Sequence, residues 1–220
     1  MFELLTGTGL AASSGLNAYI PLLTLGLLSR FTDTVSLPTG WQWLDSGWAL
    51  VILAGLLAIE MVADKVPVVD SLNDLLQTVV RPTAGGLAFG ATATSDAVTV
   101  SDPSSFVSGG QWVPVAVGVV LALVVHAGKA TARPALNTAS GGFAAPVVSV
   151  VEDVASLGLS LLALLAPILV VVALAALVAA FWWAYRKVRA RRRRKAERRA
   201  RNNGMVTDST AEAYPRNSLR

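Results

Sequence analysis

Long apolar runs, separated by short polar stretches, organise most of this chain. A helix needs roughly 20 mostly apolar residues to cross the hydrocarbon core of a membrane. The runs 48–64 and 112–128 come close to that length. A further run, 7–29, is long enough but is interrupted by Asn17 and Pro21. The pattern predicts membrane-spanning helices at these three places.

The C-terminal apolar run, 154–185, is too long for one crossing and holds Pro167 near its middle. A proline ends or kinks a helix, so we predict two helices, over about 141–164 and 168–186. The segment 84–100 is short and rich in glycine and alanine, and it either spans or forms a re-entrant half-helix. The fold class expected is therefore all-α, a polytopic membrane bundle of about six hydrophobic segments.

Charge divides the chain into two parts. Residues 1–185 hold five Lys/Arg against eleven Asp/Glu, and residues 186–220 hold thirteen against three. We therefore predict a transmembrane domain over 1–185 and a basic, largely disordered cytoplasmic tail over 186–220. A basic run directly after a span anchors the topology and contacts anionic lipid head groups. The lipid-binding residues expected in the tail are Arg186, Lys187, Arg189 and Arg191.

Loop charges predict the orientation. With the tail in the cytoplasm, as the positive-inside rule requires, six crossings place loops 65–82 and 129–140 inside and 30–47 and 101–111 outside. The inside loops then carry four cytoplasmic-edge charges: Lys65, Arg81, Lys129 and Arg133. The outside loops are mainly acidic. We expect a multi-pass protein of the plasma membrane with a cytoplasmic C-terminus.

A weak internal repeat accompanies these segments. Small-residue motifs at 14–18, 84–88 and 140–144 each open an apolar segment on its predicted cytoplasmic side. Three small-residue helices, each followed by a bulkier one, would form three helical hairpins. Internal repeats of this kind are common in transporters. The alternative is chance similarity between short apolar sequences.

A few polar residues fall inside the apolar runs, where a charge costs about 2.5–3.5 kcal/mol on insertion scales. Glu60 and Asp64 lie one turn apart on one helical face. Glu152 and His126 could face Glu60 at similar depth and form a polar cluster near mid-membrane. These residues either line a substrate or ion path or only pair the helices. The path residues predicted are Glu60, Asp64, His126, Glu152, Asp153 and Asn17.

Other chemistry finds little support. The chain has no cysteine and one histidine, which excludes thiolate metal sites and histidine clusters. Asp70 and Asp74, beside Arg81, could hold Mg²⁺ for phosphate chemistry, although such residues more often lie on a solvated interfacial helix. We predict no catalytic residue, metal, cofactor or enzymatic activity.

Several separate motifs resemble one known family. They are the run 15–21, Glu60 with 63–67 and Asp70, the run 81–85, His126 with Lys129, Arg133 and Asn137, and Ser149 with Glu152 and Asp153. Together they resemble an uncharacterised family of bacterial membrane proteins, domain of unknown function 4126, over about residues 5–180. The resemblance implies a shared fold and polar set, and it names no reaction. The longer Arg-rich tail departs from the family pattern.

Two functional hypotheses follow. The first is a small transporter or channel. The intramembrane acids would line its site, and transport would be coupled to proton movement through Glu60 or Glu152. The second is a non-transporting structural or lipid-binding membrane protein. A weaker third is a lipid-phosphate enzyme using Asp70, Asp74 and a metal. The partners expected are the lipid bilayer, anionic head groups and a second copy of the chain in a homo-oligomer, and nucleic acid is not expected.

Overall fold

The computed structural model describes residues 1–63, 67–93, 110, 112–140, 144–183, 185–187 and 189–190, without the side chains of 67–72, 74, 93, 132–140 and 144–145. Regular structure in this part of the chain is helical throughout, as the sequence predicts. The chain divides into two compact units, Met1–Phe181 and Trp182–Arg220. The helices that position the candidate site all lie in the first unit.

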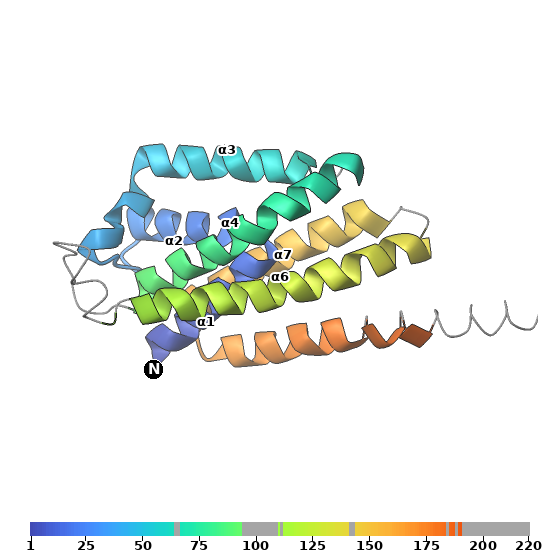
Figure 1. Cartoon of the computed structure of the whole chain (residues 1–220). Coiled ribbons are helices and arrows are strands. Elements are labelled where there is room, and N and C mark those ends of the chain that lie inside the picture. The colour runs from blue at the N-terminus through green and yellow to red at the C-terminus, as the bar shows by residue number, and fades with distance from the viewer. Residues whose placement is uncertain are drawn as a thin grey trace, which may run out of the picture. The chain divides into compact units, whose positions relative to one another are not determined.

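The chain begins with a helical hairpin that enters the bundle and turns back. Helix α1 (Phe2–Leu16) and helix α2 (Tyr19–Phe31) have 15 and 13 residues, which gives lengths of about 22 and 20 Å. Neither reaches the roughly 30 Å of a hydrocarbon core. Residues at the start of α1 and residues just after α2 line the same cavity, so both ends of the hairpin lie at one end of the unit (Figure 1). The prediction of one span over 7–29 is therefore wrong.

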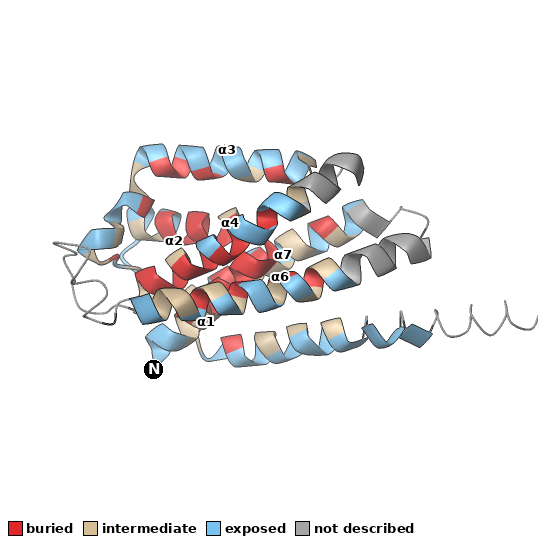
Figure 2. Cartoon of the chain, in the orientation of Figure 1, coloured by how far each residue is buried: buried red, intermediate tan, exposed pale blue. Residues whose placement is uncertain are grey.

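Helix α3 lies at one edge of the unit (Figure 1). The 3-10 helix η1 (Thr39–Asp45) precedes α3 (Gly47–Ala63) at a bend of 58°. Most of α3 is exposed, and its buried residues are confined to Ala49, Leu50, Leu53 and Glu60 (Figure 2). An apolar helix that exposes most of its surface fits a lipid environment, because hydrocarbon solvates apolar side chains.

Helix α4 (Pro67–Ala93) is continuous through a region that the sequence divides into a loop and a short segment. It includes Pro82 and has 27 residues. The prediction of a loop over 65–82 is wrong, because the polar residues of this stretch follow a helical face. Gln77 and Arg81 lie one turn apart and are both buried. These two polar residues therefore lie on the face of α4 that packs against other helices.

The C-terminal half of the unit contains the longest apolar helices. Helix α6 (Trp112–Ser140) continues through the predicted loop 129–140, and α7 (Ala144–Leu165) follows it. A turn around Pro167 separates α7 from a final helix that starts at Leu169. The predicted break at Pro167 is therefore confirmed.

Within the part of the chain that the structure describes, three helical stretches are long and apolar enough to cross a membrane, namely Trp112–Thr131, Pro146–Leu165 and Leu169–Lys187. The bent pair of η1 and α3 raises the number to four. Six crossings are not confirmed. The hairpin repeat is not seen either, because residues 14–18 lie at the α1–α2 turn whereas 84–88 lie inside α4. Apolarity and helical structure nevertheless support a membrane protein.

Helix α1 lies at the centre of the unit, and glycine lets its neighbours approach closely. A Cβ on Gly15 would lie 2.6 Å from the Ala122 carbonyl oxygen of α6. A Cβ on Gly118 would collide with the Gly85 carbonyl of α4. Nearly every residue of α1 from Gly7 to Leu16 is buried. Small residues permit this close packing where no hydrophobic effect drives helices together.

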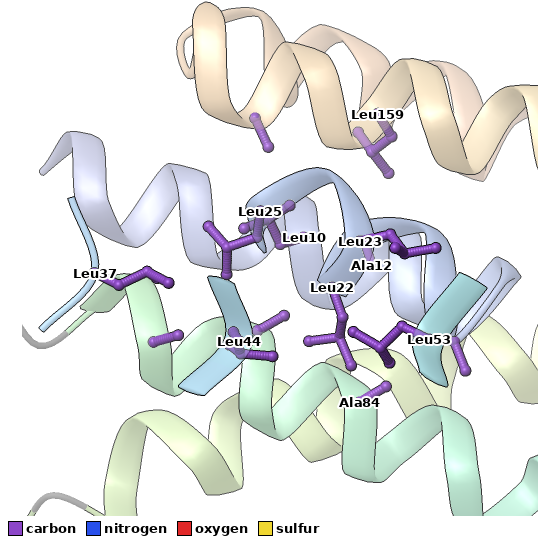
Figure 3. Packing of buried hydrophobic residues seen from close by; sticks show 14 of the residues in the cluster. Leu10, Ala12, Leu22, Leu23, Leu25, Leu37, Leu44, Leu53, Ala84 and Leu159 are labelled. Carbon is purple, nitrogen blue, oxygen red and sulfur yellow. The ribbon is translucent and has the colours of Figure 1, made fainter. Parts of the chain in front are cut away.

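The apolar core joins this centre to the hairpin and to η1. Leu10 and Leu25 from the hairpin, Leu44 from η1 and Leu159 from α7 belong to one cluster of buried side chains (Figure 3). Leu44 is fully buried, and its carbonyl oxygen lies against Gly26 of α2. The core therefore fixes α2 between η1 and the rest of the bundle.

Replacing Gly118 by alanine is expected to destabilise the unit by about 1–3 kcal/mol, the usual cost of overpacking. The new Cβ would meet backbone atoms, which cannot rotate away. The matched control is Gly158→Ala in α7, because no heavy atom lies within 4 Å of a Cβ there. Thermal unfolding in detergent, followed by tryptophan fluorescence, tests both variants. Equal melting temperatures would contradict the close α4–α6 contact.

Candidate functional site

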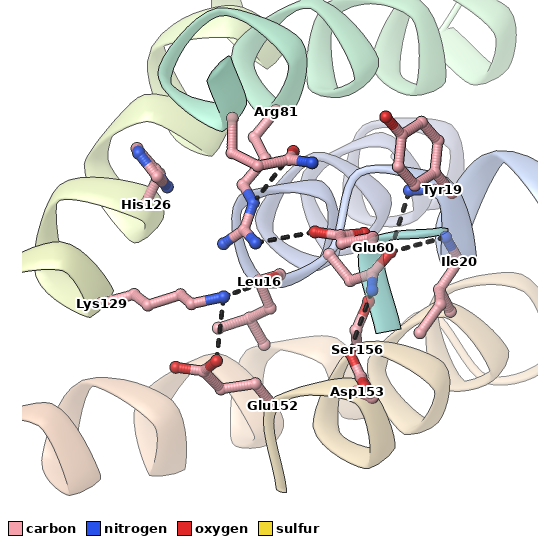
Figure 4. Close-up of polar contacts among 12 residues, drawn as sticks. Leu16, Tyr19, Ile20, Glu60, Arg81, His126, Lys129, Glu152, Asp153 and Ser156 are labelled. Atoms are coloured by element: carbon pink, nitrogen blue, oxygen red, sulfur yellow. Dashed lines mark hydrogen bonds and ion pairs between the residues drawn. The ribbon is translucent and has the colours of Figure 1, made fainter. Parts of the chain in front are cut away.

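The turn of the α1–α2 hairpin is built around Asn17, whose side chain is 1% exposed. Its Oδ1 accepts hydrogen bonds from the backbone N–H groups of Tyr19 (3.0 Å) and Ile20 (3.2 Å). Its Nδ2 donates to Asp153 Oδ1 of α7 at 2.9 Å (Figure 4). Asparagine is a favoured N-cap residue, so one side chain both starts α2 and ties the turn to α7.

The C-terminal end of α1 receives a buried arginine. Arg81 of α4 is fully buried and donates through Nη2 to Glu60 Oε1 of α3 at 2.8 Å. Its Nη1 donates to the Gly15 carbonyl oxygen at 3.4 Å. Its Nε donates to Gln77 Oε1 at 3.3 Å. The guanidinium therefore joins α1, α3 and α4 at one point inside the bundle.

A buried lysine reaches the same helix end from another side. Lys129 of α6 forms an ion pair with Glu152 of α7, with Nζ 2.9 Å from Oε2, and donates a hydrogen bond to the Leu16 carbonyl oxygen at 3.2 Å (Figure 4). The last carbonyls of a helix lack intrahelical partners, and the helix dipole favours cations there. Arg81 and Lys129 satisfy two of these carbonyls in the interior of the unit.

His126 lies one turn before Lys129 on α6. Its Nε2 is 3.2 Å from the Thr78 hydroxyl of α4, and the residue is 4% exposed. The sequence groups His126 with Glu60 and Glu152 at one depth. In the structure Glu60 and His126 are buried and Glu152 is partly buried, and the histidine points toward α4.

Two bases and three acids form the ion-pair cluster, defined here as Glu60, Arg81, Lys129, Glu152 and Asp153. With every member ionised, the formal charge of the cluster is one unit negative. The bases contact the C-terminal end of α1, and Asn17 joins the hairpin turn to Asp153. Because the net charge is negative, binding of one proton would make the cluster neutral, and the nearby acids favour that binding.

Two residues that the prediction put in cytoplasmic-edge loops lie inside helices. Arg81 and Lys129 are buried inside α4 and α6, because both helices continue through the predicted loops. Asp64 and Lys65 lie outside the described residues, as does the side chain of Arg133. Their predicted roles remain predictions.

Residues that the sequence reasoning passed over complete the site. Gln77 accepts a hydrogen bond from Arg81, and the fully buried Ser13 hydroxyl of α1 bonds to the equally buried hydroxyls of Ser156 and Ser160 on α7. Helical spacing carries the signal, since Ser13 and Asn17 are four residues apart and Asp153 and Ser156 are three apart. These spacings put polar groups on one face of each helix.

The metal hypothesis and the tail receive no test. The side chains of Asp70 and Asp74 lie outside the described part of the chain. Among the residues that are described, no three acids or histidines form a metal-binding group. In the second unit, the Arg186 guanidinium lies 5.8 Å from the ring centre of Trp182, and Lys187 Nζ lies 4.2 Å from that of Trp183.

A comparison with protein families decides the affiliation of the chain. The sequence model of one protein family, described as Domain of unknown function (DUF4126), matches residues 4–187. The chain belongs to this family. No curated protein and no solved structure matches it. The resemblance seen in the sequence is therefore confirmed, and the match covers nearly all of the described part of this DUF4126 chain.

Proposed function

We propose that this DUF4126 protein is a small membrane transporter that binds a proton at the ion-pair cluster. One observation carries the proposal. A helical hairpin is broken in the interior of an apolar bundle, and two buried bases, each also bonded to an acid, contact the carbonyls at the break. Transporters place discontinuous helices at their binding sites, where freed carbonyls and helix C-termini hold cations.

Energetics support a functional role for these charges. A buried ion pair often stabilises a protein no more than apolar side chains of similar volume would. Intramembrane charges are costly, and they mark ion pathways and proton relays. If these residues served only to hold the helices together, apolar side chains could replace the ion pairs Glu60–Arg81 and Lys129–Glu152.

The geometry provides a switch that one proton would operate. A proton bound to Glu152 removes the negative charge that holds Lys129 at 2.9 Å. Lys129 then keeps its bond to the Leu16 carbonyl, while the attraction between α6 and α7 weakens. Because the two bases contact adjacent carbonyls of α1, a change at one pair alters the field at the other.

A second candidate function is a non-transporting protein in which these residues only hold the helices together. It is favoured by the pairing of Glu60 and Glu152 with bases at salt-bridge distance. Proton movement separates the two functions, because a structural role leaves the membrane impermeable.

Proton flux into proteoliposomes tests the proposal. Purified protein is reconstituted with a pH-sensitive dye inside, and a potassium diffusion potential drives protons inward. We expect uptake above that of empty liposomes, and Glu152→Gln should abolish it. Asp33→Asn is the matched control, because it makes the same chemical change at an exposed position of the first unit.

Wild-type uptake equal to that of empty liposomes would overturn the proton proposal. Parallel gradients of Na⁺ and K⁺ extend the test to other cations. Flux of either metal ion without protons would identify a different cargo, and impermeability to all three would favour the structural function.

Orientation belongs to the same proposal. We place the basic residues after Trp183 in the cytoplasm, where anionic lipids attract them. In the first unit, we place the end at which the hairpin begins at the external face, with α3, α4, α6 and α7 crossing the membrane. The acidic residues Glu3, Asp33 and Asp45 lie near the external end in this arrangement, which agrees with the positive-inside rule.

A further inference from the structure

A cavity of about 600 Å³ opens at the end of the first unit where the hairpin begins. Its wall contains the start of α1, residues 34–38 after α2, the end of α4 and the end of α7. The polar lining consists of one carboxylate and several hydroxyls: Glu3, Thr6, Thr34, Ser36 and Thr92. Hydroxyls and an acid form a suitable entrance for water and protons.

A line of polar groups continues from this cavity into the bundle. Leu164 lines the cavity, and Ser160 lies one turn deeper on α7. The Ser13 hydroxyl of α1 is 2.8 Å from Ser160 Oγ and 2.7 Å from Ser156 Oγ. Three fully buried hydroxyls therefore form one connected group between two helices.

The serine group lies one helical turn from Asp153 of the ion-pair cluster. Asp153 lies three residues from Ser156 on α7, and it accepts the bond from Asn17. Contacts pair Thr6 with Ala163, Ser13 with Ser156 and Asn17 with Asp153. Residue numbers rise on α1 as they fall on α7, so the helices are antiparallel and both polar faces run from the cavity to the cluster. The distance along α7 from Ser160 to Asp153 is about 10 Å.

We infer that the cavity and the serine group form the route by which protons reach Asp153 of the ion-pair cluster. This inference rests on the proposed function and names its access path. Hydroxyl oxygens 2.7–2.8 Å apart leave no space for a metal ion between them. They do permit proton transfer, because a hydroxyl both donates and accepts.

Each step conserves atoms and charge. A serine oxygen accepts a proton on a lone pair and releases its own proton to the next oxygen, so every hydroxyl ends with one hydrogen. The final acceptor is the Asp153 carboxylate, which becomes a neutral acid.

Alanine substitutions at neighbouring serines test the route. Ser13→Ala interrupts the group, whereas Ser14→Ala removes an equally buried hydroxyl that bonds only to Leu10 of its own helix. In the proteoliposome assay we expect Ser13→Ala to reduce proton flux about a hundredfold, the lower end of what a positioned proton-transfer group contributes. Ser14→Ala should keep wild-type flux. Ser160→Ala, which removes the hydroxyl nearest the cavity, should repeat the loss.

The possible results separate the route from the function. If the wild type carries protons and Ser13→Ala and Ser160→Ala both match Ser14→Ala, the route is wrong and the proposed function stands. If the wild type carries none, both fall. Melting temperatures of the variants show whether a loss of flux reflects unfolding, and a stable variant without flux supports the relay.

Thiol labelling tests the cavity independently of transport. The chain has no native cysteine, so a single introduced thiol reports one position. A membrane-impermeant thiol reagent added outside intact cells should label Thr92→Cys, which lines the cavity. Gly158→Cys in α7 is the control, because its side would face lipid. Equal labelling of both, or of neither, would overturn an external entrance at this cavity.

Discussion

Replacing Arg81 by methionine is expected to destabilise the first unit by about 3–5 kcal/mol, the cost of removing one partner of a buried ion pair. The variant leaves Glu60, which is 2% exposed, without its guanidinium partner, and the Gly15 carbonyl loses a donor. Methionine retains the unbranched shape, so the change tests charge more than volume. Unfolding in mixed micelles with increasing SDS measures the free energy.

A double variant separates the value of the pair from the cost of breaking it. Arg81→Met combined with Glu60→Leu removes both charges and should recover much of the lost stability, because apolar replacement of a buried pair is often neutral. A double variant no more stable than Arg81→Met alone would show that the bond to Gly15 carries the effect. In either case proton flux should be lost, since the cluster is incomplete.

Asn17→Ala is expected to cost about 2–4 kcal/mol, because two interactions disappear together. Loss of an N-cap costs about 1 kcal/mol, and a hydrogen bond to a charged group contributes about 1.5–3 kcal/mol. The first concerns the N–H groups of Tyr19 and Ile20, and the second concerns Asp153. The same SDS titration measures the change.

Asn17→Ser divides these two contributions. Serine supplies a capping oxygen but has no amide to reach Asp153. We expect a loss about 1 kcal/mol smaller than that of Asn17→Ala. If serine and alanine are equally destabilising, the cap is of no consequence, and the bond to Asp153 alone fixes the hairpin turn.

The Arg81 and Asn17 substitutions both test the break between α1 and α2, one at the end of each helix. Arg81 and Lys129 satisfy the end of α1, and Asn17 satisfies the start of α2. A helix interrupted inside an apolar bundle needs partners for both sets of backbone groups. The polar residues of the site are those partners, which explains how ionisable side chains can persist at this depth.

Composition and local pattern determined the class of the protein. Runs of apolar residues without strand-like alternation allowed the helices and the membrane assignment to be predicted, and Pro167 marked the break before the final helix. The acids of the site could also be selected, since Glu60 and Glu152 lie within apolar runs where a charge is costly. These are properties of single segments, and a sequence displays them directly.

Only the tertiary structure decided which residues meet. Arg81 ends the polar stretch before the segment 84–100 and Lys129 directly follows the run 112–128, so the sequence placed both in loops. Helices α4 and α6 in fact continue past both residues, and their bases turn inward to acids on α3 and α7. The hairpin was equally hidden, because the mostly apolar stretch 7–29 looks like one span, and the sequence does not show that Asn17 bonds to Asp153 more than 130 residues away. Pairing across such separations depends on how helices pack, which no local pattern records.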